Sequence, residues 1–307
     1  MEFLPEGILF QQADNKARLA SVAALYEAMA EQRILEARAV LCGENHDLTV
    51  DLGEVKGIIP REEAALGIAE GTIRDIAIIS RVGRPVAFII TAMERTATGQ
   101  VVATLSRRLA QQRCTREFLD KLEPGDILPA RITHLESFGA FADIGCGVIS
   151  LIPIDMISVS RIAHPADRFH PGQLIRAVVR TREGGRISLS HKELLGSWSE
   201  NAGLFSPGQT VSGMVRSVEE YGIFVELTPN LAGLAEPKEG VRPGQQASVF
   251  IKSILPEKMK VKLIIIDSFD DPAPVIPLRY WITSGHLSRW QYSPPGCSRM
   301  VETVFSL

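Results

Sequence analysis

Two pairs of aromatic residues are the part of this sequence whose spacing best fits a chemical role. Phe138 and Phe141 lie three residues apart with a glycine between them, and Tyr221 and Phe224 repeat that arrangement. Exposed rings stack on the bases of single-stranded RNA, at about 1–3 kcal/mol per base. The pairs therefore predict base stacking, and the alternative is that all four rings belong to a hydrophobic core.

A basic residue follows each aromatic pair at an equivalent place. Arg186 and Lys260 both open the last of a series of short β-prone runs. A cation beside an aromatic platform can contact a phosphate of the bound strand. The predicted RNA-binding residues are Phe138, Phe141, Arg186, Tyr221, Phe224 and Lys260.

The two aromatic pairs belong to two copies of one unit, over residues 122–190 and 205–267. In each copy a Pro-Gly pair precedes the first ring by 14 residues, and a Gly-Gln pair follows further along. A repeat has to be recognised before other patterns, because it decides the architecture.

Each copy consists of short runs of alternating or β-branched residues separated by Gly and Pro. Such runs at regular spacing are typical of a small barrel, and five strands match the OB-fold, whose second and third strands face nucleic acid. On an ideal strand, Phe138 and Phe141 would point to opposite faces, so we expect Gly139 to introduce a kink or bulge that brings both rings to one surface. The expected strands are 127–135, 139–144, 148–152, 174–181 and 186–190, then 210–218, 222–227, 231–235, 247–254 and 259–266.

The pattern Gly-Asp…Phe-Gly-Ala-Phe-Ala-Asp-Ile-Gly…Gly-Gln…Arg-Ile-Ser-Leu-Ser resembles the S1 RNA-binding domain, named after the largest protein of the bacterial small ribosomal subunit. The resemblance covers residues 123–191 and, less closely, 206–267. It implies that an aromatic pair, a His on the third strand and an acidic and a basic residue around the last strand form the RNA surface. Phe138, Phe141 and Arg186 match this pattern.

The sequence departs from the family at two kinds of position. The family His falls at Pro153 in the first copy and at Glu236 in the second. The family Asp falls at about Arg182 and Pro256. The resemblance therefore implies an RNA surface that is only partly of the usual kind.

A degenerate copy precedes the two clear ones. When Val50-Asp51-Leu52-Gly53 is aligned on Ala142-Asp143-Ile144-Gly145, His46 and Thr49 take the ring positions and Val102 takes the position of Arg186. This copy keeps the barrel pattern without a stacking platform. Because leading repeats of the family dock onto the ribosome or onto proteins, the resemblance implies contact with the small ribosomal subunit through residues 1–121.

We predict an all-β fold with connecting helices, made of tandem five-stranded OB-fold barrels of the S1 type. Helical spacing predicts helices over residues 16–35, 107–122 and 192–201, and Trp198 is expected to be a packing anchor. The last part of the chain contains many prolines and rings without a strand or helix period, and we expect it to pack back on the chain rather than to bind a partner. The expected division is 1–121 (helix, degenerate barrel and connector helix), 122–195 (S1 domain), 196–268 (linker helix and second S1 domain) and 269–307 (tail).

Composition limits the remaining classes of function. The chain has 33 Lys and Arg against 36 Asp and Glu, so RNA binding is expected to depend on stacking and a local patch of charge. Four isolated cysteines and scattered histidines predict reduced thiols and no metal site. The sequence shows no nucleophile–base pair and no phosphate-binding glycine loop, which predicts neither an enzyme nor a cofactor.

The start of the sequence has no basic stretch leading into an apolar run, and no apolar stretch is as long as a membrane span. We therefore expect a cytoplasmic protein without a membrane partner. The predicted function is binding of single-stranded mRNA to assist translation. The alternatives are a non-ribosomal RNA-binding regulator of mRNA stability or translation, and a protein-docking scaffold of degenerate barrels.

Overall fold

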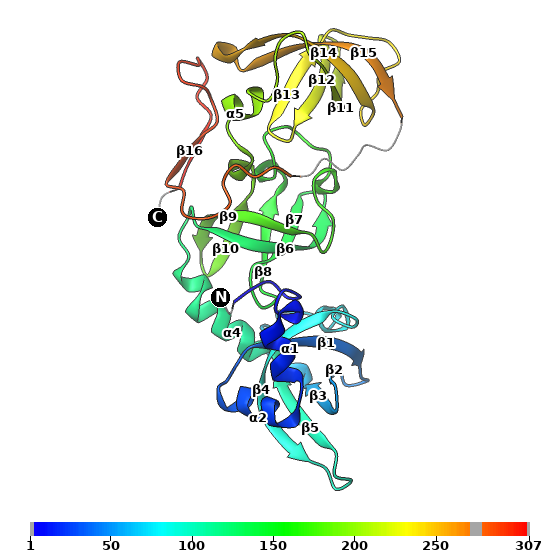
Figure 1. Cartoon of the computed structure of the whole chain (residues 1–307), viewed down its shortest axis with the longest axis vertical. Coiled ribbons are helices and arrows are strands. Elements are labelled where there is room, and N and C mark those ends of the chain that lie inside the picture. Colours follow the sequence, from blue (N-terminus) through cyan, green and yellow to red (C-terminus); the bar gives the residue numbers. More distant parts are fainter. Residues whose placement is uncertain (1–2, 271–277, 306–307) are drawn as a thin grey trace. The chain divides into compact units, whose positions relative to one another are not determined.

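The structure is a computed structural model that describes residues 3–270 and 278–305. Over this range the chain forms three closed five-stranded barrels, followed by a two-stranded sheet (Figure 1). The predicted fold class is therefore confirmed. The chain divides into two compact units, residues 1–122 with 129–131 and 142–149, and residues 123–128 with 132–141 and 150–307. The four-part division of the chain stays a prediction.

The first barrel has the strand order β1-β2-β3-β5-β4. Along β2 and β3, buried side chains alternate with more exposed ones, so that one face of each strand lines the apolar interior. Strand β3 pairs with β5 in the parallel sense. Its strands are β1 Leu35–Cys42, β2 Leu48–Leu52, β3 Val55–Ile59, β4 Pro85–Arg95 and β5 Val101–Ser106.

Two short helices pack on this barrel where the sequence predicted one. Helix α1 spans Ala13–Leu19 and α2 spans Val22–Ala30. They are separate because the Ser21 hydroxyl accepts the Ala24 N–H and so starts a new helix. Leu25 is fully buried against the barrel core. The predicted helix was therefore right in place and wrong in extent.

The second and third barrels contain all the strands predicted for the two clear repeats. The second barrel has the order β10-β8-β7-β6-β9 and the third has the order β11-β12-β13-β15-β14. The strands are β6 Ile127–Glu136, β7 Gly139–Asp143, β8 Ile149–Pro153, β9 Leu174–Glu183, β10 Arg186–Ser190, β11 Thr210–Glu219, β12 Gly222–Thr228, β13 Leu231–Ala235, β14 Gln246–Leu255 and β15 Lys260–Phe269.

The remaining helices are short connections. Helix α4 spans Arg107–Glu117 and begins at Ser106, whose hydroxyl accepts the Leu109 N–H. Trp198 opens α5 and is buried in the core of the third barrel, which confirms its packing role. The others are α3 Ile76–Ile79, α5 Trp198–Ala202 and the 3-10 helices η1 Leu9–Gln11, η2 Arg61–Glu63, η3 Leu119–Lys121, η4 Ile154–Met156, η5 Pro165–Asp167, η6 Lys192–Leu195 and η7 Pro256–Lys258.

A buried ion cluster joins the second and third barrels. Arg168, from the β8–β9 connection, pairs with Glu226 of β12, and Arg216 Nε lies 2.8 Å from the same carboxylate. The side chains of Arg168 and Glu226 are almost fully buried. Because an unpaired buried charge is very costly, this cluster holds the two barrels together only while all partners are present.

The tail packs back on the chain, as predicted, and it contacts both of these barrels. Its strands β16 Arg289–Gln291 and β17 Glu302–Val304 pair in the antiparallel sense. Trp290 and Tyr292 enter the core of the third barrel, and Phe305 packs with Val178 of the second. Three prolines of the predicted tail, Pro272, Pro274 and Pro277, lie outside the described residues.

Candidate nucleic-acid interface

Phe138 and Tyr221 reach their neighbouring rings because they lie in turns. Each is the residue immediately before a second strand, β7 or β12, so the alternation of a strand does not apply to it. The predicted bulge at the glycine is wrong for the third barrel, where the irregularity in the β11–β12 pairing lies on β11, between Val215 and Ser217.

The glycine after each first ring has a steric role instead. A Cβ on Gly139 would lie 2.5 Å from the Ile152 carbonyl oxygen, and a Cβ on Gly222 would lie 2.6 Å from that of Ala235. Contacts this short are not tolerated, so only glycine lets the third strand come this close. The aromatic-Gly-x-aromatic pattern therefore places a leucine of the third strand, Leu151 or Leu234, directly beside the glycine between the rings.

The two ring pairs have nearly the same geometry. Phe138 and Phe141 meet edge to face with ring centroids 5.9 Å apart, and Tyr221 and Phe224 do so at 6.1 Å. Phe138 is 55% exposed and Tyr221 is 68% exposed, whereas the second ring of each pair is half-buried. A core residue would be covered, so the exposure favours a stacking surface over a packing role for the first rings.

His134 of β6 adds a third ring that sequence reasoning did not assign. Its imidazole lies parallel to the ring of Phe141, with centroids 4.3 Å apart and 8° between the planes. The side chain is exposed. The signal in the sequence was weak, because His134 lies seven residues before Phe141 and only the pairing of two strands brings the rings together.

The register of the third barrel defines a row of cross-strand neighbours, which we call the central row. Phe224 faces Leu234 on β13, and Leu234 faces Lys262 on β15. Ser217 and Ser253 complete the row at its two ends. Lys262 is exposed, and no carboxylate in the described part of the chain pairs with it.

The two predicted cations, Lys260 and Arg186, lie near this row and its counterpart in the second barrel. Each lies two residues before the position on the last strand that belongs to the row. Lys260 and Arg186 are the first residues of β15 and β10, and both are exposed. Lys260 precedes Lys262 by two residues and so shares its face of the strand. In the second barrel the position of Lys262 is taken by Ser188, which faces Leu151 and Thr181.

The central row of the first barrel has neither a ring nor a cation. It runs Leu41, Thr49, Ile58, Thr104 and Ala92. Thr49 is at the place of Phe224, and Val102 precedes Thr104 as Lys260 precedes Lys262. The register therefore agrees with the alignment of Thr49 and Val102 made from the sequence.

Residues 121–192 match the family model described as the S1 RNA binding domain. The second barrel is therefore an S1-type domain. The small ribosomal subunit protein bS1 homolog of Bacillus subtilis is 30% identical over 159 residues, which are 50% of this chain and 39% of that protein. The small ribosomal subunit protein bS1 of Rhodopseudomonas palustris is 30% identical over 152 residues, 48% of this chain and 25% of that protein. The chain thus spans well under half the length of these relatives.

Similar solved structures share little sequence with this chain. A multidomain protein with nucleic acid binding domains from Streptococcus pneumoniae is 13% identical, with a TM-score of 0.26, over 77% of this chain and 74% of that one. The solution structure of GSP13 from Bacillus subtilis is 24% identical, with a TM-score of 0.22, over 23% of this chain and 55% of that one. None of the helices in the described ranges is long and apolar enough to cross a membrane.

The positions at which this chain departs from other S1 domains do not rebuild the usual surface. Pro153 is the last residue of β8 and has no imidazole to donate or accept a hydrogen bond. Glu236 follows β13, and its carboxylate lies 3.9 Å from Lys252 Nζ, with both side chains largely exposed. Exposed pairs of this kind contribute little. Arg182 lies in β9 and Pro256 opens η7, so neither offers the family carboxylate.

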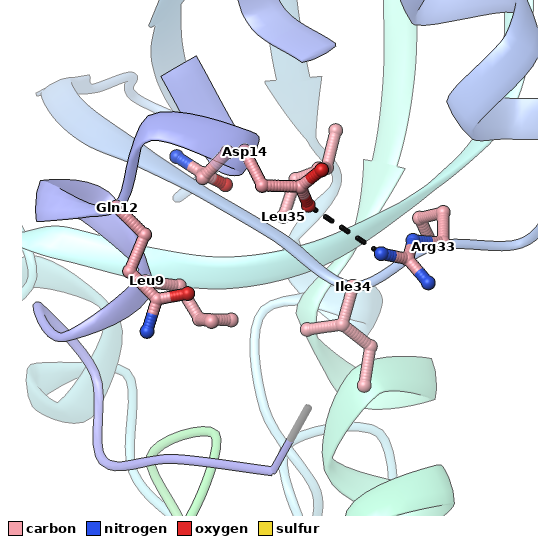
Figure 2. Close-up of a pocket in the computed structure, with 7 residues that line it drawn as sticks. Leu9, Gln12, Asp14, Arg33, Ile34 and Leu35 are labelled. Carbon is pink, nitrogen blue, oxygen red and sulfur yellow. Dashed lines mark hydrogen bonds and ion pairs between the residues drawn. The ribbon is translucent and has the colours of Figure 1, made fainter. Parts of the chain in front are cut away.

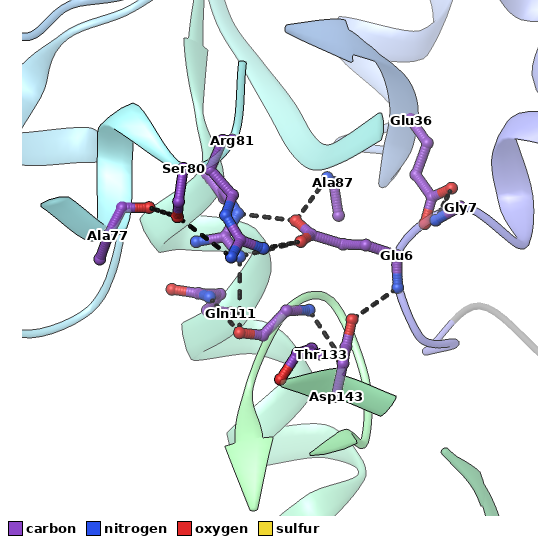
Figure 3. Close-up of polar contacts among 12 residues, drawn as sticks. Glu6, Gly7, Glu36, Ala77, Ser80, Arg81, Ala87, Gln111, Thr133 and Asp143 are labelled. Carbon is purple, nitrogen blue, oxygen red and sulfur yellow. Dashed lines mark hydrogen bonds and ion pairs between the residues drawn. The ribbon is translucent and has the colours of Figure 1, made fainter. Parts of the chain in front are cut away.

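A second polar cluster is buried and belongs to the first compact unit. The Glu6 carboxylate is 2.6 Å from Arg107 Nε, and the Glu6 N–H donates to Asp143 Oδ2 at 2.7 Å (Figure 3). Burial opposes the ionisation of Glu6, but Arg107 outweighs it and lowers the pKa of that carboxyl. Burial, followed by the charge of Glu6, raises the pKa of Asp143 to about 7. These groups are covered by protein, so the cluster stabilises the unit and does not present a binding surface.

Glu36 belongs to the same cluster. Its Oε2 accepts the Gly7 N–H at 2.8 Å (Figure 3). The same oxygen accepts the Phe10 N–H, also at 2.8 Å. Within the described residues, no donor reaches its buried Oε1. Burial raises the pKa of Glu36 to about 8, so the group holds a proton at neutral pH.

A pocket of about 280 Å³ lies beside α1, at the start of β1 (Figure 2). Its two charged side chains face each other, with Arg33 Nη2 3.4 Å from Asp14 Oδ2. Because these charges satisfy one another, the pocket does not offer a charged group to a ligand. It is lined by Leu9, Gln12, Asp14, Asn15, Arg33, Ile34 and Leu35.

Proposed function

We propose that this chain binds single-stranded RNA through the aromatic faces of its second and third barrels and that it assists translation, as its resemblance to ribosomal protein S1 implies. The observation that carries the proposal is the exposure of Phe138 and Tyr221, at 55% and 68%. Each ring stands beside a half-buried partner that holds it in place. An ordered ring with a free face is what base stacking requires.

The six proposed RNA-binding residues are those predicted from the sequence, Phe138, Phe141, Arg186, Tyr221, Phe224 and Lys260. Electrostatic attraction is expected to contribute less to RNA binding than stacking does. The chain has a net charge of −3, so no broad positive surface attracts the phosphates. Binding is therefore expected to depend more on stacking than on charge, and to fall less steeply with salt than it does for strongly basic proteins.

The first barrel is proposed to have a different role. Its central row carries Thr49 and Thr104 where the third barrel carries Phe224 and Lys262. Without a ring or a cation, this face is poorly suited to RNA. We propose that residues 1–121 contact the small ribosomal subunit or another protein. A role at the ribosome would mean that the chain acts in the cytoplasm.

The test is binding of the full chain to a fluorescent single-stranded oligoribonucleotide, measured by anisotropy. The double variant Phe138→Leu, Tyr221→Leu keeps apolar volume at both turns and removes the two exposed rings. We expect it to bind at least tenfold more weakly than the parent chain. Val304→Ser, at another exposed apolar residue, is the control and should bind like the parent. Equal affinity of the parent and the double variant would reject the proposal.

Two alternative functions make different predictions in the same experiments. An RNA-binding regulator that acts on mRNA off the ribosome would bind the oligoribonucleotide and fail to co-sediment with small ribosomal subunits. A docking scaffold would show no RNA binding, a reading favoured by the near-neutral charge and by Glu236 at the family His position. Co-sedimentation with purified subunits therefore follows the binding assay.

A further inference from the structure

The second and third barrels have the same framework but different side chains at two matched positions. Phe141 and Phe224 are equivalent, and so are Leu151 and Leu234, because each leucine contacts the glycine between the rings. In the third barrel, Ser217 faces Phe224, whereas in the second barrel His134 lies against Phe141. The last strand carries the second difference, and here the third barrel has the larger side chain and the second barrel has the serine. Lys262 faces Leu234, whereas Ser188 faces Leu151.

His134 changes which ring surfaces of the second barrel are free. At 4.3 Å and 8°, its imidazole covers one face of Phe141, and Phe138 meets Phe141 edge to face. His134 and Phe138 are the exposed rings at this site, whereas Phe141 is half-buried. Phe141 holds both in place from the middle. In the third barrel Ser217 takes the place of His134, so no ring covers the corresponding face of Phe224.

Lys262 changes the charge of the third barrel in the same row as its rings. The residue is exposed and is separated from Phe224 by a single strand. Strands lie about 4.8 Å apart, so an extended lysine reaches the phosphate of a nucleotide whose base stacks on Phe224. The row of the second barrel offers only the hydroxyls of Ser188 and Thr181 beyond Leu151.

We propose that the two faces add different contacts to one RNA strand, with the second barrel adding a base contact through His134 beside Phe138 and the third adding a phosphate contact through Lys262 beside its rings. This inference rests on the proposed function, and it adds His134 and Lys262 to the binding residues. It predicts that the contributions of His134 and Lys262 separate in salt dependence and in their need for bases.

Two oligomers and two variants of the full chain test it. The oligomers are a fluorescent 20-nucleotide oligouridylate and a 20-unit ribose-phosphate chain that lacks bases. His134→Ser gives the second barrel the residue of the third, and Lys262→Ser gives the third barrel the residue of the second. Affinity is measured from 50 to 300 mM KCl, and Thr104→Ser, in the matching row of the first barrel, is the control.

We expect His134→Ser to bind the oligouridylate at least fivefold more weakly, with an unchanged salt slope and unchanged binding to the abasic chain. Lys262→Ser is expected to weaken binding to both oligomers and to reduce the slope of log K against log salt by about 0.7, the value for one contact to a single strand. The reciprocal variant Ser188→Lys should increase the slope by a similar amount.

Three results overturn the inference. They are a Lys262→Ser variant with the parent slope, a His134→Ser variant with the parent affinity for oligouridylate, and equal losses on both oligomers for His134→Ser. If the parent chain itself binds no oligouridylate, the proposed function fails as well. A parent that binds and variants that do not respond defeat only the inference.

Discussion

Glu36 gives the sharpest prediction for the stability of the first compact unit, because it is a buried acid with a raised pKa. Burial raises the pKa of this carboxyl from its ordinary value of 4.5 to about 8 in the folded protein. The folded chain therefore keeps a proton that the unfolded chain releases above pH 4.5. Stability from this group is present at low pH and is lost as pH rises towards 8.

The magnitude follows from the size of the shift. One pKa unit is worth about 1.4 kcal/mol, so raising the pH from 5 to 8 should cost the unit about 3 kcal/mol. Asp143, with its pKa raised to about 7, acts in the same direction. Glu6 has a lowered pKa, so its contribution is lost only as pH falls below the unfolded value of 4.5, outside this window.

Hydrogen exchange of β1, which contains Glu36, is the suitable assay because it reports the unit locally. After correction for intrinsic exchange rates, protection of β1 should be higher at pH 5 than at pH 8. The Glu36→Gln variant keeps an oxygen for the Gly7 and Phe10 N–H groups and removes the ionisable proton. Its protection should depend much less on pH, and Glu44→Gln, at an exposed site, is the control. Equal protection of the parent chain at pH 5 and pH 8 would show that Glu36 is not protonated as argued.

Further substitutions test the proposed RNA surface and the joint between the barrels. Phe138→Ala is expected to weaken RNA binding by about 1–3 kcal/mol without loss of folding, and a loss of cooperative melting would instead identify the ring as core. Arg186→Ala should weaken binding less and reduce the salt slope, and an unchanged slope would exclude a phosphate contact. Glu226→Ala leaves the buried Arg168 without its carboxylate partner and should destabilise the second unit by about 3–5 kcal/mol, measured by denaturant unfolding. Tyr280→Phe removes a hydroxyl that lies 3.0 Å from His191 Nε2 and accepts the Arg176 N–H, so the same measurement should show a loss of about 1–2 kcal/mol.

The fold could be predicted from the sequence because its signals are local. Alternating runs, Gly and Pro in the turns, and the two copies of the ring pattern each depend on residues a few positions apart. The exposure of Phe138 and Tyr221 is also local, because both lie in short turns. The split of the predicted helix over 16–35 depends on a single cap at Ser21 that hydrophobic spacing does not show.

The parts of the site that escaped prediction depend on contacts between strands. His134 acquires its role only when β6 pairs with β7, and Lys262 joins the rings only through the register of β13 and β15. Lys260 was predicted because it aligns with Arg186. An alignment gives the position of a residue along its strand, but it does not show which residue lies opposite on the neighbouring strand. The charged cluster around Glu6 was also missed, since its partners Arg107 and Asp143 lie 101 and 137 residues further along the chain.

The contact between the tail and the second barrel has a consequence for the order of events during synthesis. Asp126, just before β6, pairs with His286, which lies 160 residues later. At about 5–20 residues per second, a ribosome needs roughly 8–30 s to add the intervening chain. During that interval the apolar cluster around Val178 lacks its tail members Tyr280, Leu287 and Phe305. The second barrel is therefore synthesised well before the tail that covers its apolar cluster. Until the third barrel and the tail have been synthesised, this cluster stays exposed to other molecules.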